Sequence, residues 1–191
     1  MINLAVFASG TGSNFDAIIQ AIEEGTLEAR VSLLICDKIE APVIEKAQEY
    51  NIDTVVFNAK CYEDKVAYER ALLHDCQSRD IDYIILAGFM RLIGPTLLEP
   101  YEHRILNIHP SLLPAFPGKG AIGQAFDKQV KVTGVTVHFV DNGMDTGPII
   151  DQEPVRIDPA DTRADVQKKI QAVEHKLYPR VIQSLLVKEE S

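Results

Sequence analysis

The segment Asn107–Pro114 places an amide, an imidazole and two prolines directly after the apolar pair Ile105-Leu106. The end of a buried strand is where open α/β sheets bind their ligands. Asn107 and His109 are two residues apart, so both side chains lie on one side of an extended backbone. An amide donor and a titratable imidazole, tuned by the distant carboxylate of Asp145, are the groups that acyl transfer requires. These three residues are therefore our candidates for catalysis.

Each of the three residues also has a simpler explanation. Asn and Asp often cap turns, and a buried His often does no more than satisfy a backbone carbonyl. His109, His138 and Asp145 could alternatively bind a metal ion, as two imidazoles and one carboxylate. His138 lies among alternating apolar residues and has no second ligand two or four positions away, so the spacing disfavours a metal site.

A second candidate site is the glycine-rich loop between the first apolar run and the first helical pattern. Glycines let the backbone approach a ligand, and free N–H groups at a helix N-terminus attract an anion. Gly12, Ser13 and Asn14 are therefore candidate phosphate ligands, unless the loop is only a tight, well-capped turn. No Lys follows the glycines, which excludes a P-loop, and Phe15 replaces the third glycine of a dinucleotide fingerprint. A nicotinamide dehydrogenase remains an alternative, because Asp37 stands where a ribose-binding acid would lie.

Three separated motifs, in this order, resemble those of the folate-dependent formyltransferases. They are Ala8–Asn14, Asn107–Pro114 and Asp145–Pro148, and the resemblance extends to Glu174–Pro179. The resemblance implies that 10-formyltetrahydrofolate is a co-substrate and that no metal is needed. The implied acceptor is the amine of 5′-phosphoribosylglycinamide, in de novo purine (IMP) biosynthesis.

Three other activities are left open by these motifs. Hydrolysis of formyltetrahydrofolate would use the same three catalytic residues, but an additional N-terminal domain is expected of such an enzyme. Another 10-formyltetrahydrofolate-dependent N-formyltransferase, acting on a tRNA or a sugar nucleotide, is expected to carry an additional C-terminal domain. A non-catalytic anion-binding module is the alternative outside the enzymes.

The resemblance also implies roles for individual residues. Asn107 would donate to the oxyanion, His109 would move the proton between the two nitrogens, and Asp145 would orient the imidazole and stabilise its cation. The residues implied for the phosphate and ribose of the substrate are Gly12, Ser13, Asn14, Gln171, Ala172, Val173 and Glu174. The residues implied for folate are Lys65, Met90, Arg91, Leu92, Ile93, Asn107, Asp141, Asn142, Gly143, Met144 and Asp145.

The chain departs from the family pattern in two places. Lys65 stands where some members have Arg, so a point charge replaces a bidentate fork near the folate tail. Residues 119–124 contain no His, whereas some members have histidines there. The second departure argues against an accessory His in that segment and leaves the three candidate catalytic residues unaffected.

Composition and charge limit the classes of function. The chain has 191 residues, of which 46% are hydrophobic and 25% charged, as in a single globular domain. Its formal net charge of −9 argues against a nucleic-acid or anionic-membrane partner, whereas a small phosphorylated substrate needs only local donors. No apolar run reaches the roughly 20 residues of a membrane span, and the first residues lack the basic region of a signal peptide. We expect a cytoplasmic protein that acts on small molecules as a monomer or homodimer.

Apolar runs alternate with helical patterns over the first 110 residues, which predicts a parallel sheet covered on both faces. The predicted strands are Leu4–Ala8, Val31–Cys36, Thr54–Phe57, Tyr83–Ala87 and Ile105–Ile108. Helices are predicted around residues 15–22, 42–50 and 68–76.

The pattern changes in the second half of the chain. Val135–Val140 and Ile149–Ile157 predict two antiparallel strands, and a helix follows from Thr162 to about Val187, bent or interrupted at Pro179. We therefore predict a single-domain, Rossmann-like α/β fold with helices on both faces. Its sheet is mostly parallel in the N-terminal half, with antiparallel strands added in the C-terminal half. Residues 1–110 form the phosphate-binding half, and residues 111–191 supply the folate loop and the last helix.

Overall fold

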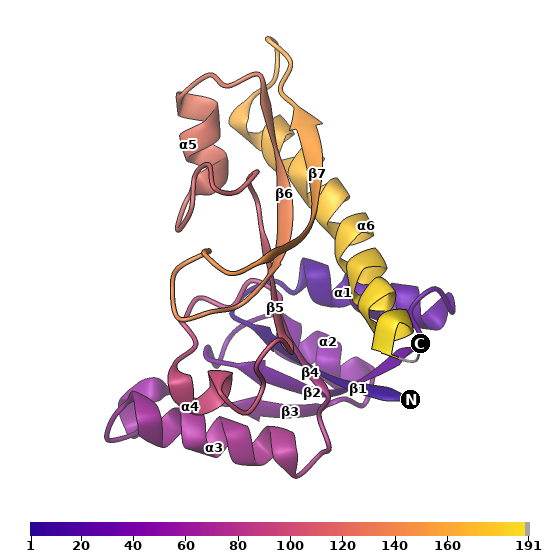
Figure 1. The fold of residues 1–191 in the computed structure, drawn as a ribbon, viewed down its shortest axis with the longest axis vertical. Helices are drawn as coiled ribbons and strands as arrows, with labels where there is room; N and C mark the ends of the chain where they lie inside the picture. Colours follow the sequence, from indigo (N-terminus) through magenta and orange to yellow (C-terminus); the bar gives the residue numbers. More distant parts are fainter. Residues whose placement is uncertain (190–191) are drawn as a thin grey trace.

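The computed structural model describes residues 1–189, which form a seven-stranded mixed sheet with helices on both faces (Figure 1). The strand order is β3-β2-β1-β4-β5-β6-β7. The strands are β1 (Ile2–Ala8), β2 (Ala29–Cys36), β3 (Asp53–Val56), β4 (Tyr83–Leu86), β5 (Ile105–His109), β6 (Val132–Phe139) and β7 (Ile149–Arg156). The first five strands are parallel, and β6 and β7 each run antiparallel to the preceding strand. The predicted fold class is confirmed.

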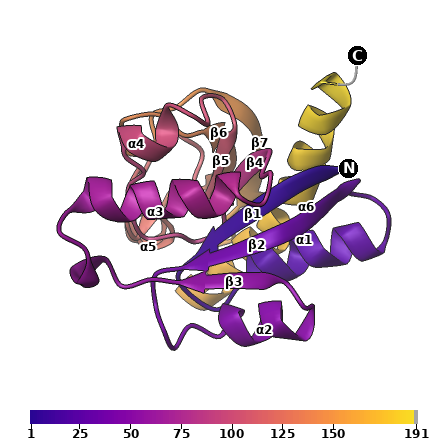
Figure 2. The ribbon, with the colours of Figure 1, turned by 90° about the horizontal axis from the view of Figure 1, so that it is seen from below.

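Helices cover the two faces of the sheet unequally. They are α1 (Ser13–Glu23), α2 (Val43–Glu49), α3 (Lys65–Gln77), α4 (Pro95–Leu98), α5 (Ala121–Asp127) and α6 (Arg163–Glu189), with a 3₁₀ turn η1 (Ala59–Cys61). Figure 2 shows α3 and α4 on one side of the sheet and α1 and α2 on the other, where α6 also packs. Among the helices of residues 1–189, none is both long enough and apolar enough to cross a membrane.

The two faces explain why the strands read as continuous apolar runs. In β1, Leu4, Val6 and Ala8 contribute to the core beneath α1, α2 and α6, whereas Ala5 and Phe7 contribute to the core beneath α3 and α4. All five residues are fully buried. A strand covered on both sides has no solvent face, so its sequence shows no polar alternation.

Several predicted boundaries differ from the structure. Pro179 does not interrupt the last helix, because α6 continues through it to Glu189. The apolar side chains that flank this proline are buried, and their burial outweighs the roughly 3 kcal/mol that an interior proline costs. Phe57 and Ala87 each lie one residue beyond the end of their strand. His109, in contrast, is the last residue of β5 rather than part of the following loop.

Helices α4 and α5 and the 3₁₀ turn are absent from the predicted set. Each is at most seven residues long, and α4 begins with a proline at its first position. Such short segments contain too few turns for an apolar periodicity to develop.

The last helix also holds the centre of the sheet through a hydroxyl group. Tyr178 Oη on α6 lies 2.9 Å from the carbonyl oxygen of Leu86 and 3.0 Å from that of Leu106. These carbonyls belong to β4 and β5, and the tyrosine is fully buried. The buried hydroxyl thus has partners on two neighbouring strands and joins α6 to both of them.

Tyr178→Phe should lower the free energy of unfolding by about 0.5–1.5 kcal/mol, because it removes the hydrogen bond of a fully buried hydroxyl while keeping the ring. Urea unfolding monitored by circular dichroism measures this change. Tyr50→Phe, at an exposed position after α2, is the matched control and should change stability by less than about 0.5 kcal/mol. Equal effects of the two substitutions would contradict the assigned role of the Tyr178 hydroxyl.

Candidate active site

The three predicted catalytic residues meet at one cavity. Asn107 and His109 come from β5, and Asp145 comes from the loop between β6 and β7. His109 Nδ1 lies 3.4 Å from Asp145 Oδ2, and Asn107 Nδ2 lies 3.5 Å from Asp145 Oδ1. All three line a cavity of about 510 Å³, within the range of small-molecule sites. Asn107 and His109 thus lie on the cavity side of β5, as their spacing of two residues predicts.

Asp145 is held by local backbone geometry. Its φ of 56° lies in the left-handed region, and its Oδ2 accepts a 2.7 Å hydrogen bond from the amide of Gly118. The residue two positions after Asp145 must be a glycine, because a Cβ at Gly147 would lie 1.8 Å from the carbonyl oxygen of Phe139. The contact with His138, together with the Gly118 amide and the imidazole of His109, lowers the pKa of Asp145 against the opposing effect of burial. Asp145 is therefore a carboxylate at neutral pH.

The orientation of His109 determines which of its ring nitrogens is free to face the cavity. Nε2 lies 2.8 Å from the carbonyl oxygen of Phe116, which can only accept, so Nε2 carries the hydrogen. In the neutral ring, Nδ1 then has the free lone pair, and this atom faces Asp145 and the cavity. The hydroxyl of Ser111 donates to the carbonyl of Ala115 and lies 3.3 Å from that of Phe116, which helps to fold this loop. The loop thus fixes the tautomer of the imidazole.

His138 is a site residue that sequence reasoning did not select. Its Nδ1 donates to the carbonyl of Phe139 at 2.8 Å. Its Nε2 lies 3.3 Å from Asn107 Nδ2 and 3.7 Å from Asp145 Oδ1. When neutral, His138 accepts from the amide; when protonated, it attracts the carboxylate. The pairing of β5 with β6 sets His138 directly opposite Asn107, so an antiparallel alignment of the two predicted strands could have revealed it.

The metal alternative finds no support in this arrangement. His109, His138 and Asp145 lie close together, as that reading required. Within residues 1–189, however, no group of three or more His, Cys, Asp or Glu side chains is placed to hold a metal ion.

Two loops form the apolar part of the cavity. The predicted folate residues that line it are Met90, Arg91, Leu92, Ile93, Asn107, Gly143, Met144 and Asp145. Met90 and Met144 are largely exposed, so thioether side chains stand at the surface of both loops. Adaptable side chains of this kind suit a flat aromatic ligand.

Within residues 1–189, the remaining predicted folate residues do not line this cavity; they are Lys65, Asp141 and Asn142. Asp141 folds the turn instead, because its Oδ1 accepts from the amide of Gly143 and the hydroxyl of Thr146. Asn142 lies within that turn. Lys65 begins α3, and its Nζ lies 3.7 Å from Glu69 Oε1, beside the end of the Met90–Ile93 loop.

The predicted phosphate and ribose residues are divided by the structure. Asn14 and Glu174 reach the cavity, and Asn14 Nδ2 lies 3.4 Å from Glu174 Oε2. Gly12 (φ 77°) forms the turn before α1, where a Cβ would lie 2.6 Å from Val43 Cγ2. In the part of the chain that the structure describes, five of the predicted residues do not line this cavity: Gly12, Ser13, Gln171, Ala172 and Val173. Ser13 and Ala172 line a separate groove between α1 and α6.

Within residues 1–189, Glu174 is a buried carboxyl that forms no salt bridge. Burial raises its pKa to about 7, and the hydrogen bond from Asn14 opposes this shift. Asn14 Oδ1 is itself buried without a partner within the described structure. The pair therefore offers a donor-acceptor set that a polar ligand can satisfy.

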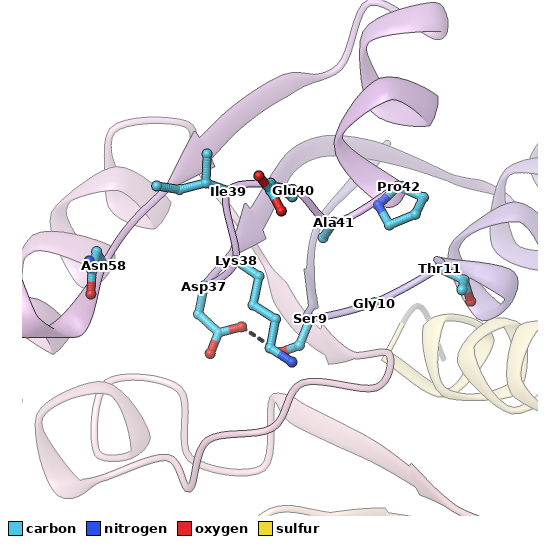
Figure 3. Close-up of a pocket in the computed structure, with 10 residues that line it drawn as sticks. All are labelled: Ser9, Gly10, Thr11, Asp37, Lys38, Ile39, Glu40, Ala41, Pro42 and Asn58. Carbon is cyan, nitrogen blue, oxygen red and sulfur yellow. Dashed lines mark hydrogen bonds between the residues drawn. The ribbon is translucent and has the colours of Figure 1, made fainter.

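A second cavity, of about 610 Å³, lies on the other side of the glycine-rich loop (Figure 3). Asp37 faces it, but both carboxylate oxygens are already engaged. Oδ1 accepts from Ser9 Oγ at 2.5 Å, and Oδ2 accepts from Arg91 Nε at 2.8 Å. Only 5% of the Asp37 side chain is exposed, so it is not accessible to a ribose, which removes the support for the dehydrogenase alternative.

Glu174→Gln should stabilise the chain increasingly as the pH rises from about 4.5 to about 7. The pKa of Glu174 is raised only in the folded chain, so the carboxyl contributes its full stabilisation below the pKa of the unfolded chain. This contribution to the free energy of unfolding is lost as the pH rises from the unfolded pKa to the folded pKa. Above about pH 7, the free energy of unfolding of the variant should exceed that of the wild type by about 3 kcal/mol at most. Urea unfolding at about pH 5 and about pH 8 measures it, with the exposed Glu28→Gln as control. A pH-independent difference would contradict the raised pKa.

Comparison with known proteins extends the similarity over nearly the whole chain. Residues 2–182 match the formyl transferase family. Phosphoribosylglycinamide formyltransferase of Bacillus subtilis is 52% identical over 186 residues, which are 97% of this chain and 95% of that protein. The glycinamide ribonucleotide transformylase 1 of Geobacillus kaustophilus is 56% identical, with a TM-score of 0.95 and coverage of 97% and 99%. The phosphoribosylglycinamide formyltransferase of Bacillus halodurans is 53% identical, with a TM-score of 0.95 and coverage of 98% and 96%.

The matched region includes the three strands and loops that bring Asn107, His109 and Asp145 together. Sequence, fold and coverage agree at this level of identity, and this chain belongs to the formyl transferase family.

Proposed function

We propose that this chain transfers the formyl group of 10-formyltetrahydrofolate to the amine of 5′-phosphoribosylglycinamide, a step of de novo purine (IMP) biosynthesis. Its full-length similarity to proteins of the corresponding name supports this activity. The observation that carries the proposal is the position of His109. Its Nε2 is held by a carbonyl, and its Nδ1 is presented beside a carboxylate at the cavity.

These groups account for a complete proton balance. The amine attacks the formyl carbon, forming a C–N bond and a tetrahedral oxyanion, while His109 Nδ1 takes the amine proton. Asp145 stabilises the imidazolium at 3.4 Å. The C–N bond to folate then breaks, and the proton passes from His109 to the departing nitrogen. Holding both reactants in one cavity makes the attack effectively unimolecular.

Asn107 is our candidate for the oxyanion donor. Its amide hydrogens face His138 and Asp145 at 3.3 and 3.5 Å, which are long for hydrogen bonds. A developing oxyanion is a stronger acceptor than either partner at these distances, so it can take one of the two hydrogens. His138 and Asp145 hold the amide in position until then.

We assign the rest of the cavity to the two substrates. The Met90–Ile93 and Gly143–Met144 segments form the folate side. Asn14 lines the cavity, and with Gly12 and Ser13 beside it, outside the lining, it supplies donors for the phosphate, whereas Glu174 on α6 faces the ribose or the amine. Residues 1–110 thus supply the phosphate-binding half, and residues 111–191 supply the folate loop and the last helix. Residues 190 and 191 of this range lie outside the described structure.

We also infer that the enzyme works on small molecules in the cytoplasm, as a monomer or homodimer. The three cysteines support this compartment, since Cys36, Cys61 and Cys76 are all free thiols. Free thiols are typical of proteins from reducing environments.

The activity is tested by incubating the purified chain with 10-formyltetrahydrofolate and phosphoribosylglycinamide. Loss of the formyl donor is followed spectroscopically, and the formylated product is identified by mass spectrometry. Formate release without the amine would indicate a hydrolase, and no loss of donor would indicate a binding module. His109→Ala serves as the inactive control.

Asp145→Asn should slow turnover and move the His109-dependent limb of the pH profile of kcat/KM to lower pH. The substitution retains an acceptor for the Gly118 amide but removes the anion that stabilises the imidazolium. His109→Ala should remove the limb and lower kcat by about 10²–10⁴-fold. The double variant should be little worse than His109→Ala, because the pair acts as a unit. Fully additive losses, or an unmoved limb in Asp145→Asn, would show that the two residues do not cooperate.

A further inference from the structure

The two loops assigned to the two substrates leave neighbouring parallel strands. Ser9 directly follows β1 and leads into the glycine-rich loop, whereas Met90 lies in the loop after β4. The hydroxyl oxygen of Ser9 accepts a 3.0 Å hydrogen bond from the amide of Met90. Ser9 is buried, with 4% of its surface exposed. A single side chain therefore joins the backbones of the two substrate loops.

Asp37 at the end of β2 fixes that side chain. Its Oδ1 accepts the Ser9 hydroxyl hydrogen at 2.5 Å, so the Ser9 oxygen presents its lone pairs to Met90. In Figure 3, Asp37 and Ser9 point toward one another at the second cavity. Only 5% of the Asp37 side chain is exposed, and a buried carboxylate requires a cation or several donors.

Arg91 supplies that cation from the folate loop itself. Its Nε donates to Asp37 Oδ2 at 2.8 Å. Its guanidinium carbon lies 5.9 Å from the ring centroids of both Phe57 and Tyr68, which lie next to each other in a stacked arrangement. A planar guanidinium held over aromatic rings keeps one orientation. The guanidinium of Arg91 is therefore held at Asp37 and beside these two rings, although 36% of the side chain remains exposed.

We propose that Ser9, Asp37 and Arg91 are positioning residues that set the backbone of Met90 and Arg91 for folate and couple it to the phosphate loop. This inference rests on the proposed function for the identity of the two ligands. Through Ser9, a displacement of either loop changes the hydrogen bond on which the other depends. The second cavity thus has a polar wall because the network needs Asp37 there, and that wall is satisfied without a ligand.

The first test removes the shared hydroxyl. Ser9→Ala should accelerate hydrogen exchange of the Met90 amide in the substrate-free chain, because that amide loses its acceptor. It should weaken binding of a non-reactive folate analogue by about 5–10-fold. It should also shrink the factor by which phosphoribosylglycinamide changes the dissociation constant of that analogue, since linkage between the sites passes through Ser9.

The second test uses charge and additivity. Arg91→Lys keeps a cation near Asp37 and should retain more folate affinity than Arg91→Met. Ser9→Ala and Arg91→Met should be non-additive, because both act through Asp37. Arg79→Gln is the matched control, since it removes an ion pair with Asp53 at the opposite ends of the strands. It should leave Met90 exchange and both affinities unchanged.

An unchanged rate of Met90 amide exchange in Ser9→Ala would overturn the proposal. Equal losses of affinity for the folate analogue and for phosphoribosylglycinamide would also overturn it, if the factor by which one ligand changes the dissociation constant of the other stayed the same. The exchange measurement needs no substrate, so it remains decisive even if the wild-type chain fails to formylate phosphoribosylglycinamide. Such a failure would overturn the proposed function alone.

Discussion

A carboxylate buried beside two imidazoles is the constraint on which the site depends. Asp145 can remain ionised in this position only because Gly118 donates to it and two histidines lie within reach. The surrounding chain conforms to that requirement. Asp145 adopts a left-handed backbone conformation, Gly147 leaves room for the carbonyl of Phe139, and the loop after β5 folds back to present the Gly118 amide. Burial strengthens these electrostatic contacts, which is the environment that acyl transfer uses.

Much of the fold follows from residue patterns that a buried parallel sheet imposes. The apolar runs gave the seven strands to within a few residues, because a strand covered on both faces has little choice of composition. Pro179 shows where such reasoning fails. Local propensity predicts a break, but the core contacts of Tyr178, Val181 and Ile182 belong to tertiary structure and override it.

The candidate site likewise contains side chains that the sequence predicts and contacts that only the structure reveals. Asn107, His109 and Asp145 were found from residue type, strand spacing and motif, and the structure brings them together. The carbonyl of Phe116 and the amide of Gly118 could not be found this way, because backbone groups carry no sequence signal. The Ser9–Asp37 contact joins residues 28 positions apart, and only the adjacency of β1 and β2 makes it visible. Sequence therefore indicates which side chains are candidates for the chemistry, whereas the fold determines which atoms hold them.

The bridge from Tyr178 to the carbonyls of β4 and β5 has a consequence for biosynthesis. The strands that carry the cavity are made early, but the hydroxyl that satisfies their ends lies on the last helix, as does Glu174. During translation, an emerging chain of 150 residues already has all of its parallel strands but not the helix whose hydroxyl joins β4 to β5. The bridge between these strands can form only after α6 has also left the ribosome, which takes a few seconds more at ordinary rates of synthesis. The cavity thus gains Glu174 and the Tyr178 bridge only after the strands that carry its other residues have been made.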